Sequence, residues 1–579
     1  MQKPNILLIT SDQLGPFLKR LCQVTRQDMA LPMNTGAEAV ETALKAARKW
    51  AYKVKGISDG GAEIIACEGN FHGRTTTIVG FSSEPEYRDG FGPFAGGFKR
   101  IAYGDASAFS AAITPNLVCQ PSRASILTGQ LPLTHGVWDN GVDLDPATGE
   151  AGFAGALAGA GYATTYIGKA HFATKSTFEA TGTPEDRFNG ALYDQGWKGP
   201  YMGFDHAELA VLGHFSRLRP WMRPVVGHYE RWFLERGRDE EALALWNASL
   251  QPEIGAAQTW HSALPEAWHG STWTADRTIA WLRGRDTEKP FCLWASFGDP
   301  HNPFDCPAPW NMMYRPEDLP LPRHRVPDLE RRPWWHKAVL EGEPQLADPI
   351  MRRFRTQGSR VPPQSDEQLR HMTANYYGMI SLLDHSVGRI LDCVRDLGLD
   401  NDTLVVFTTD HGEFLGNHGL YLKHPIPYED LLRIGLIMRG PGVVAGGKVD
   451  EVVSTLDLAQ TFQQAAGVAA LLPQQGESLM ALAGGDSASR RGAWSEWHVH
   501  ASRCGVALKL RTVRTRTHKC TFELDSGAGE LYDLVNDPEE MHNRFDDPAY
   551  KGVRDDLEQM MRERPGAIRT PLAEPIGMA

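Results

Sequence analysis

The 579-residue sequence has few cysteines, no excess of positive charge and no long apolar run. Its eight cysteines are scattered and form no Cys-x-x-Cys pair, which argues against a disulfide framework or a zinc cluster and favours a reducing compartment. The formal net charge of −12 argues against a nucleic-acid partner, although a local basic pocket is compatible with it. No stretch approaches the roughly 18 apolar residues of a membrane span, and the first apolar run is too short for a signal peptide. These absences predict a cytoplasmic protein with no membrane partner.

The length exceeds what one hydrophobic core usually holds, so at least two domains are expected. Near the end of the chain, "VALKLRTVRTRTHKCTFEL" (506–524) alternates in the manner of a strand pair. The helical pattern "VRDDLEQMMRE" follows at 553–563. Together these segments predict a small C-terminal α+β domain.

Two apolar runs end in polar residues that can bind a metal ion. The run "NILLIT" (5–10) leads to Asp12, and "TLVVFTT" (403–409) leads to Asp410 and His411. Because open α/β sheets place ligands beyond the carboxyl ends of their strands, these side chains can converge on one divalent cation. Carboxylates suit Ca²⁺, while the imidazole leaves Mn²⁺ or Zn²⁺ open. Taken alone, Asp12 is equally well interpreted as a turn former or a helix N-cap.

A long helix is expected between the two runs. The stretch "SDEQ" (365–368) has the form of a capping box, an apolar stripe of helical period follows, and Gly398 supplies a stop. A helix followed by a buried strand is typical of α/β architecture.

The stretch "NLVCQPSRASILTG" (116–129) carries the most specific chemical signal of the chain. By itself Cys119 is either a small buried hydrophobic residue or a thiol nucleophile. The pattern Cys-x-Pro-Ser-Arg, however, resembles the signature of the sulfatases, in which the cysteine is oxidised to formylglycine after translation. Five further segments resemble sulfatase elements in the family's order: "GYATTYIGKAH" (161–171), "DPHNPF" (299–304), "TTDHG" (408–412), "LYLKH" (420–424) and "GELYDLVNDPEEMHN" (529–543).

The resemblance implies an α/β fold of the alkaline-phosphatase-like type, a sandwich with a mostly parallel central sheet, followed by the small C-terminal α+β domain. It implies formylglycine derived from Cys119 as nucleophile and one divalent metal, Ca²⁺ first, with Mn²⁺ or Zn²⁺ as alternatives. Its implied metal ligands are Asp12, Asp410 and His411. The implied catalytic residues are Cys119, Arg123, Lys169, His171, His301 and Lys423.

Each catalytic candidate has an expected task. Arg123, Lys169 and Lys423 would surround the anionic sulfate, aided by the helix that starts near Pro121. His301 would protonate the leaving alcohol, and His171 would orient the hydrated aldehyde or take its proton. His418 remains structural or peripheral to the site, and the sequence leaves open whether His498 and His500 face the pocket.

The implied reaction is hydrolysis of a sulfate monoester. A phosphonate monoester or phosphodiester hydrolase would use the same residues and stays an alternative. The expected partners are a small-molecule sulfate ester and a formylglycine-generating maturation enzyme, and a homo-oligomer is allowed. Of seven tryptophans between residues 221 and 281, most are expected in the core and some could line the pocket.

Residues 14–115 differ in kind from the rest of the chain. The stretches "MNTGAEAVETALKAARKWAYKV" (33–54) and "GNFHGRT" (69–75) resemble an internal piece of a class III aminotransferase of the ornithine aminotransferase type. There Gly36 and Ala37 would bind the phosphate of pyridoxal phosphate and Phe71 would stack on its ring. The family's acidic partner for the pyridine nitrogen and its Schiff-base lysine lie further along and are absent here, which argues against a transaminase.

The chain is therefore interpreted as a chimera, and a catalytically inactive chimera is one alternative. The expected parts are a sulfatase catalytic domain from residues 1–13 and 116–485, an aminotransferase-like segment at 14–115, and a C-terminal subdomain at 486–579. The tripeptide "TPN" (114–116) would suit either side of the join.

Overall fold

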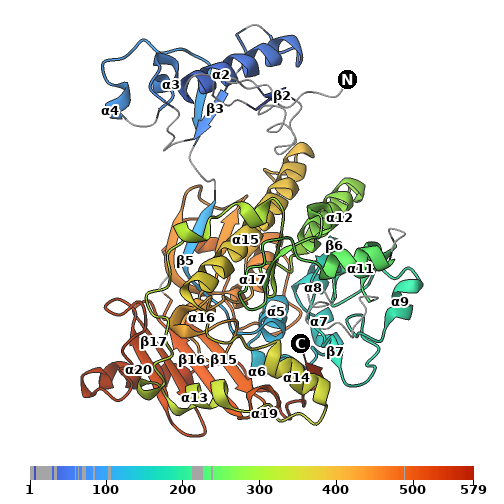
Figure 1. Ribbon diagram of the computed structural model, residues 1–579, viewed down its shortest axis with the longest axis vertical. Helices are drawn as coiled ribbons and strands as arrows, with labels where there is room; N and C mark the ends of the chain where they lie inside the picture. Colours follow the sequence, from blue (N-terminus) through green and yellow to red (C-terminus); the bar gives the residue numbers. More distant parts are fainter. Residues whose placement is uncertain are drawn as a thin grey trace. The chain divides into compact units, whose positions relative to one another are not determined.

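The computed structural model describes residues 6–7, 29–30, 36–58, 60–62, 64–67, 73–82, 85–101, 106–211, 226–235, 239–487 and 490–578. The chain divides into two compact units, Met1–Ala106 and Ser107–Ala579 (Figure 1). Asp12 and Phe71 lie outside the described residues, so the roles expected of them stay predictions.

The smaller unit contains short strands and one long helix. Strand β1 (Ile6–Leu7) pairs in parallel with β2 (Met29–Ala30), and β3 (Ile64–Cys67) with β4 (Phe98–Ile101). The expected helical run forms α2 (Gly36–Lys53), followed by α3 (Thr76–Gly80) and α4 (Pro85–Arg88). Its described apolar core is small: the buried Ile78 and Phe81 pack with the partly buried Ala37, Val40, Leu44 and Phe98.

Two sheets of the larger unit precede its C-terminal sheet and position the candidate site. One sheet has the order β12 (Val405–Thr408), β13 (Leu436–Arg439), β5 (Ser107–Ile113) and β14 (Lys448–Ser454). In it β5 pairs in parallel with β14, whereas β13 pairs antiparallel with both β5 and β12. The other sheet, β10 (Phe291–Ser296), β6 (Ala163–Gly168) and β8 (His206–Leu209), is parallel throughout.

Strand β5 ends at Ile113, shortly before Cys119. Its residues alternate between buried and exposed at first and are all buried at the end, as expected for an inner strand that has sheet neighbours on both sides. Phe109 joins the main core cluster, and Ile113 joins the cluster beneath the C-terminal sheet. The boundary between the compact units therefore lies before β5, and the segment ahead of Cys119 supplies a strand of the larger unit.

The expected long helix is α15 (Asp366–Asp396). Ser365 caps it in a capping box with Gln368, and Gly398 follows its end with a φ of 71°. The helix packs against α12 (Gly270–Gly284) and β11 (Phe304–Pro307). Most of its expected stripe is buried or half-buried, but Ile380 is exposed, and Met379 and Leu382 are buried in the adjoining positions.

The C-terminal part confirms the expected strand pair and helix. Strands β15 (Ala493–Val499), β16 (Leu508–Arg514), β17 (His518–Glu523) and β18 (Gly529–Asp533) form an antiparallel sheet, and α20 (Lys551–Arg562) packs on β16 and β17. Trp497 of this sheet is buried in the same cluster as Val118, directly before the candidate nucleophile. The C-terminal sheet thus shares a core with the start of α5 (Cys119–Thr128).

The remaining elements are short. They are α6 (Pro132–His135), α7 (Pro146–Glu150), α8 (Phe153–Gly159), β7 (Ser176–Thr177), α9 (Gly190–Asp194), α10 (His228–Leu234), α11 (Asp239–Asn247), β9 (Thr259–Ser262), α13 (Trp334–Glu341), α14 (Pro349–Gln357), α16 (Glu429–Leu432), α17 (Leu458–Ala466), α18 (Met480–Ala483), α19 (Ala501–Cys504) and β19 (Gly577–Met578).

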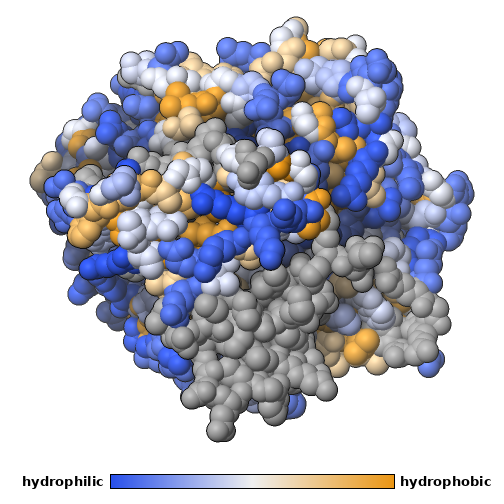
Figure 2. Space-filling model, turned by 90° about the horizontal axis from the view of Figure 1, so that it is seen from above, coloured by the Kyte–Doolittle hydropathy of each residue, from blue (hydrophilic) through white to orange (hydrophobic). Residues whose placement is uncertain are grey.

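Among the described residues, no helix is both long enough and apolar enough to cross a bilayer. On the face shown in Figure 2, hydrophilic residues predominate over the coloured surface and hydrophobic ones form small separate patches.

Candidate active site

The candidate nucleophile lies at the first turn of α5. Val118 is the N-cap residue in an extended conformation, Cys119 is the first helical residue, and Pro121 occupies the first turn, where a missing N–H costs nothing. All ten residues of α5 are buried, and Cys119 is 1% exposed. The packed helix therefore holds the Cys119 side chain in one place.

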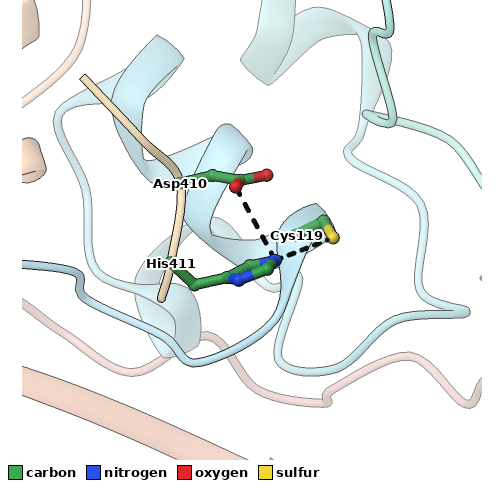
Figure 3. Close-up of side chains that lie close together, drawn as sticks. All are labelled: Cys119, Asp410 and His411. Carbon is green, nitrogen blue, oxygen red and sulfur yellow. Dashed lines mark hydrogen bonds and ion pairs between the residues drawn. The ribbon is translucent and has the colours of Figure 1, made fainter. Parts of the chain in front are cut away.

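Strand β12 ends next to this cysteine, as the sequence predicted. The Cys119 Sγ lies 3.1 Å from His411 Nε2, and that nitrogen lies 3.6 Å from Asp410 Oδ1 (Figure 3). One ligand atom from each residue falls within 4.8 Å of the others. His411 Nδ1 lies 2.8 Å from the carbonyl oxygen of Gly412 and donates to it. This hydrogen bond orients the ring so that Nε2 faces Cys119 Sγ and the Asp410 carboxylate. A carboxylate oxygen and an imidazole nitrogen so arranged fit a divalent cation.

Arg123 supports Asp410. Its Nε donates to Asp410 Oδ2 at 2.8 Å, and its Nη1 donates to the carbonyl oxygen of Lys169 at 2.8 Å and to Ser296 Oγ at 2.7 Å. Burial raises the pKa of Asp410, but the charges of His411 and Arg123 outweigh it and hold that pKa below its ordinary range. Asp410 is therefore ionised, as a metal ligand must be.

The backbone of Asp410 is also held by side chains that the sequence analysis did not select. Its carbonyl oxygen accepts from Thr114 Oγ1 at 2.7 Å and from Ser122 Oγ at 2.6 Å. Asn116 donates through Nδ2 to the carbonyl oxygen of Glu496 at 2.7 Å and accepts from the Val118 N–H at 3.0 Å. The tripeptide at the expected join therefore ties the start of α5 to the Asp410 strand end and the C-terminal sheet. Single hydroxyls and amides carry no spacing signal, so only the folded chain reveals this role.

Two lysines face the Cys119 sulfur. Lys169 Nζ, directly after β6, and Lys423 Nζ each lie 3.6 Å from Sγ. Burial raises the pKa of the Cys119 thiol, but Lys169, Lys423 and His411 more than compensate, so the pKa lies well below its ordinary value. The surroundings of this atom therefore favour negative charge.

His301 contacts the second of these lysines. Its Nε2 lies 2.7 Å from Lys423 Nζ, and its Nδ1 lies 2.6 Å from the carbonyl oxygen of Asn302. Since a carbonyl can only accept, Nδ1 carries the proton and Nε2 accepts from Lys423. Burial, followed by the charges of Lys423 and Lys169, lowers the pKa of His301 well below its ordinary value. The imidazole is neutral in this state.

His171 is held in a rare backbone conformation, with a φ of 58°. The buried carboxylate of Glu185 accepts from the backbone N–H groups of His171, Phe172 (2.8 Å) and Ala173 (3.0 Å), and from the Tyr201 hydroxyl at 2.7 Å. Burial lowers the pKa of His171 to about 3, so this imidazole is neutral at physiological pH. Glu185 was not selected from the sequence, because a single carboxylate in "TPED" carries no motif.

A cleft of about 560 Å³, open to solvent, is lined by Cys119, Lys169, His171, His301 and Lys423. The structure thus brings the sequence-selected residues together, with Arg123 beneath Asp410 and Asp12 outside the described part. A neighbouring hollow of about 650 Å³ shares Lys169 and His301 with the cleft and has Trp246 and Tyr229 in its wall.

The histidines left open by the sequence do not line the cleft. His418 is buried and stacks on Tyr428, with ring centroids 4.1 Å apart. His500 caps α19 by accepting from the Ser502 N–H at 3.1 Å, and His498 lies within β15. These three side chains therefore contribute to packing and helix capping and do not line the cleft.

Two protein-family profiles match the larger part of this chain. The sulfatase family profile matches residues 97–468, which is more than half of the chain, so the chain belongs to the sulfatase family. A profile for the C-terminal region of N-sulphoglucosamine sulphohydrolase matches residues 416–565.

Solved structures establish the fold as alkaline-phosphatase-like. Phosphonate monoester hydrolases from Silicibacter pomeroyi and Agrobacterium radiobacter superpose with TM-scores of 0.64 and 0.61, each at 24% identity over 79% of this chain and 88% of theirs. A protein solved with its substrate D-glucosamine-2-N,6-O-disulfate superposes with a TM-score of 0.57 at 20% identity, over 87% of this chain and 96% of its own.

The beginning of the chain matches a different family. The class III aminotransferase profile covers residues 3–124 and so overlaps the sulfatase match. The ornithine aminotransferases of Brevibacillus brevis and Bacillus subtilis are 65% and 62% identical over 106 residues, 18% of this chain. The chain spans about a quarter of the length of these relatives, 27% and 26% respectively.

Proposed function

We propose that this protein hydrolyses a sulfate monoester, with formylglycine made from Cys119 as the nucleophile and a divalent cation at Asp410 and His411. The observation that carries the proposal is the convergence on one buried sulfur of Lys169 and Lys423, each at 3.6 Å, and His411 at 3.1 Å. The geometry and the family together support it.

Formylglycine, hydrated to a geminal diol, supplies one hydroxyl to attack sulfur and a second hydroxyl whose deprotonation releases sulfate, which a serine could not do. A divalent cation supplies charge that lowers the pKa of the attacking hydroxyl and neutralises the sulfate. Asp410 and His411 would hold the cation, Ca²⁺ first, and Asp12 is the proposed further ligand. The maturation enzyme that oxidises Cys119 would be a required partner.

Within the chain, the two lysines would bind the sulfate oxygens, because both ammonium groups already face the nucleophilic position. Arg123 would act on the substrate indirectly, because its hydrogen bonds go to Asp410, Ser296 and the backbone of Lys169. Its role would be to orient Asp410, the proposed metal ligand, and the backbone at Lys169.

Proton transfer falls to His301 and His171. His301 Nε2 accepts a hydrogen bond from Lys423 Nζ at 2.7 Å, and an anionic ester entering beside the pair would favour the protonated imidazole. That imidazolium can then give its proton to the leaving alcohol. His171, neutral and held by Glu185, is suited to take a proton from the second hydroxyl.

A phosphonate monoester hydrolase is the second candidate. The Asp–His pair at the end of β12 and the likeness in fold to two phosphonate monoester hydrolases favour it. The test is turnover of an aryl sulfate and of the matching aryl phosphonate by protein whose Cys119 aldehyde has been verified by peptide mass spectrometry. A higher kcat/KM for the sulfate is expected, and a large preference for the phosphonate would replace the proposal.

The chimeric origin of residues 14–115 is part of the proposal. Two profiles from unrelated families overlap at residues 97–124, and the expected join at 114–116 falls inside that range. A folded chain with a verified aldehyde and bound cation that turned over neither substrate would instead support an inactive chimera.

A further inference from the structure

The tail segment "GELYDLVNDPEEMHN" (529–543) resembles a sulfatase element, yet the proposed reaction uses none of its residues. Glu540 of this segment is 1% exposed and has a φ of 56°, in the left-handed region that residues with a side chain seldom adopt. Because that backbone conformation and the burial of a carboxylate both cost free energy, they indicate a specific task for Glu540.

Glu540 forms a buried ion pair with Lys519 of β17, and neither side chain is more than 2% exposed. Both partners also bind the backbone directly before and at the start of α16. Glu540 Oε2 accepts from the Glu429 N–H at 2.7 Å, and Lys519 Nζ donates to the carbonyl oxygen of Pro427 at 2.5 Å. Arg514 of β16 contacts the Glu429 carboxylate at 3.2 Å. The C-terminal sheet and its tail therefore hold this stretch of backbone through three contacts.

The residues that follow support the turn that contains His411. The N–H of Gly412 donates to the carbonyl oxygen of Leu431 at 2.9 Å, and the N–H of Glu413 donates to that of Asp430 at 3.1 Å. The two backbones are so close that a Cβ at position 412 would lie 1.8 Å from the Asp430 oxygen. Position 412 therefore accepts only glycine while α16 keeps its place.

This turn in turn sets the direction of the His411 ring. His411 Nδ1 donates to the Gly412 carbonyl oxygen at 2.8 Å, and Nε2 lies 3.1 Å from Cys119 Sγ. A continuous path of hydrogen bonds and short backbone stretches thus leads from the Glu540–Lys519 pair, through residues 427–431 and Gly412, to the proposed metal ligand.

We propose that the Glu540–Lys519 pair positions His411, which makes the C-terminal sheet a part of the metal site. This inference rests on the proposed function and adds two positioning residues to it. Neither residue is among the described residues that line the cleft, so both act through His411 and not on the substrate. Partners that orient an imidazole ligand raise metal affinity, because the ring is already ordered when the ion binds.

The test is calorimetric titration of Ca²⁺ into the native chain and two variants. Lys519→Met should weaken Ca²⁺ binding about tenfold, the lower end of the range for outer partners of metal ligands. The double variant Lys519→Met/Glu540→Gln leaves no unpaired buried charge, so it should regain most of the native melting temperature. It still lacks the ammonium group that holds Pro427, so its Ca²⁺ affinity should stay low. Native affinity in the double variant would overturn the inference.

Turnover gives a second measurement of the same effect. If the variants differ from the native chain only in metal binding, excess Ca²⁺ should restore their kcat for an aryl sulfate. A kcat that stays low at saturating Ca²⁺ would contradict a role confined to the metal ligand.

Arg490→Met is the matched control. Arg490 forms another buried ion pair of the larger unit, with Asp457 at 2.5 Å, and also contacts Glu477 at 3.6 Å, so neither contact involves residues 427–431. The variant should lower the melting temperature and leave the Ca²⁺ affinity unchanged. An equal loss of affinity here would mean that any broken ion pair has this effect, and the inference would fail.

Hydrogen exchange separates this inference from the proposed reaction. Deuterium uptake by the peptide that contains Gly412 and Glu413 should rise in the double variant without metal and stay native in Arg490→Met, because only the former loosens the partners of these amides. If uptake rises while the native chain binds no Ca²⁺, the proposed metal is wrong and the positioning role stands. Unchanged uptake in a native chain that binds Ca²⁺ and turns over sulfate would show that the positioning role is wrong.

Discussion

The two compact units of the chain differ in how much they bury. In the smaller unit the described buried apolar residues are Ala51, Ala62, Ile78, Val79 and Phe81. In the larger unit Trp273, Trp335 and Trp497 are all less than 2% exposed, and the catalytic candidates lie among such residues. Because burial of apolar surface is the main source of folding free energy, the larger unit should have most of the stability.

The segment with aminotransferase resemblance contributes to both units. The smaller unit spans Met1–Ala106, whereas β5, which lies within both family matches, is an inner strand of the larger one. Small residues alternate along β5 with Phe109 and Ile113, a pattern that a sheet can accept. Because β5 also lies within the sulfatase match, its place in the larger unit agrees with either origin.

Replacing the nucleophile should have the largest effect of any change in the larger unit. Cys119→Ser should lower the turnover of an aryl sulfate at least about 10⁴-fold, because its single hydroxyl can be sulfated and cannot release the sulfate. The measurement is steady-state kinetics with mass spectrometry of the enzyme. Cys393→Ser, at another buried cysteine of this unit, is the control and should keep its activity; near-native activity of Cys119→Ser would refute the proposed chemistry.

The same core substitution in each unit tests the comparison directly. Phe153→Ala in the larger unit should lower the free energy of unfolding of the main transition by about 3–5 kcal/mol. Phe81→Ala in the smaller unit should leave that transition and the activity unchanged. Calorimetric melting with activity assays measures both. A shared loss would mean that the two units unfold as one.

The affinity for Ca²⁺ tests whether Asp12, which belongs to the smaller unit, is a ligand of the proposed metal site. Asp410→Asn should weaken Ca²⁺ binding at least about tenfold, since it removes a charged ligand held by Arg123. Asp12→Asn should do the same if the predicted ligand is correct. Calorimetric titration measures both, with the exposed Asp450→Asn as control. Unchanged affinity in Asp12→Asn would confine the metal site to the larger unit.

Acid should destabilise the larger unit before carboxylates titrate. Burial, together with the charges of Arg564 and Arg569, lowers the pKa of His135 to about 3. Since the unfolded pKa is about 6.5, the unfolded chain binds the extra proton between these values, and stability is lost as pH falls through that window. From pH 6.5 to 5 this group should cost about 2 kcal/mol.

The check is chemical denaturation of the native chain and of His135→Gln across that pH range. The variant should have a shallower dependence on pH in the main transition. Parallel curves would show that His135 does not carry the effect.

Much of the site was predictable because its residues belong to local patterns. Cys119 and Arg123 lie in one helical turn, Asp410 and His411 follow a strand, and Lys169 follows another. The sequence did not identify Thr114 or Asn116, whose partners Asp410 and Glu496 lie far along the chain. It did not identify Glu185 either, because the partners of this carboxylate are mostly backbone N–H groups, which carry no side-chain pattern. Likewise, the antiparallel insertion of β13 between β12 and β5 has no signature in a short apolar run.

The connection from β5 to the nucleophile has one further consequence. Only five residues, Thr114 to Val118, separate the strand from Cys119, and hydroxyl and amide contacts hold both ends of this linker. A genetic crossover within this linker can replace residues but cannot insert or delete one. A linker longer or shorter by one residue would move the Cys119 thiol away from Lys169 and Lys423. The number of residues in this linker, together with the side-chain contacts of Thr114 and Asn116, therefore sets the position of the nucleophile.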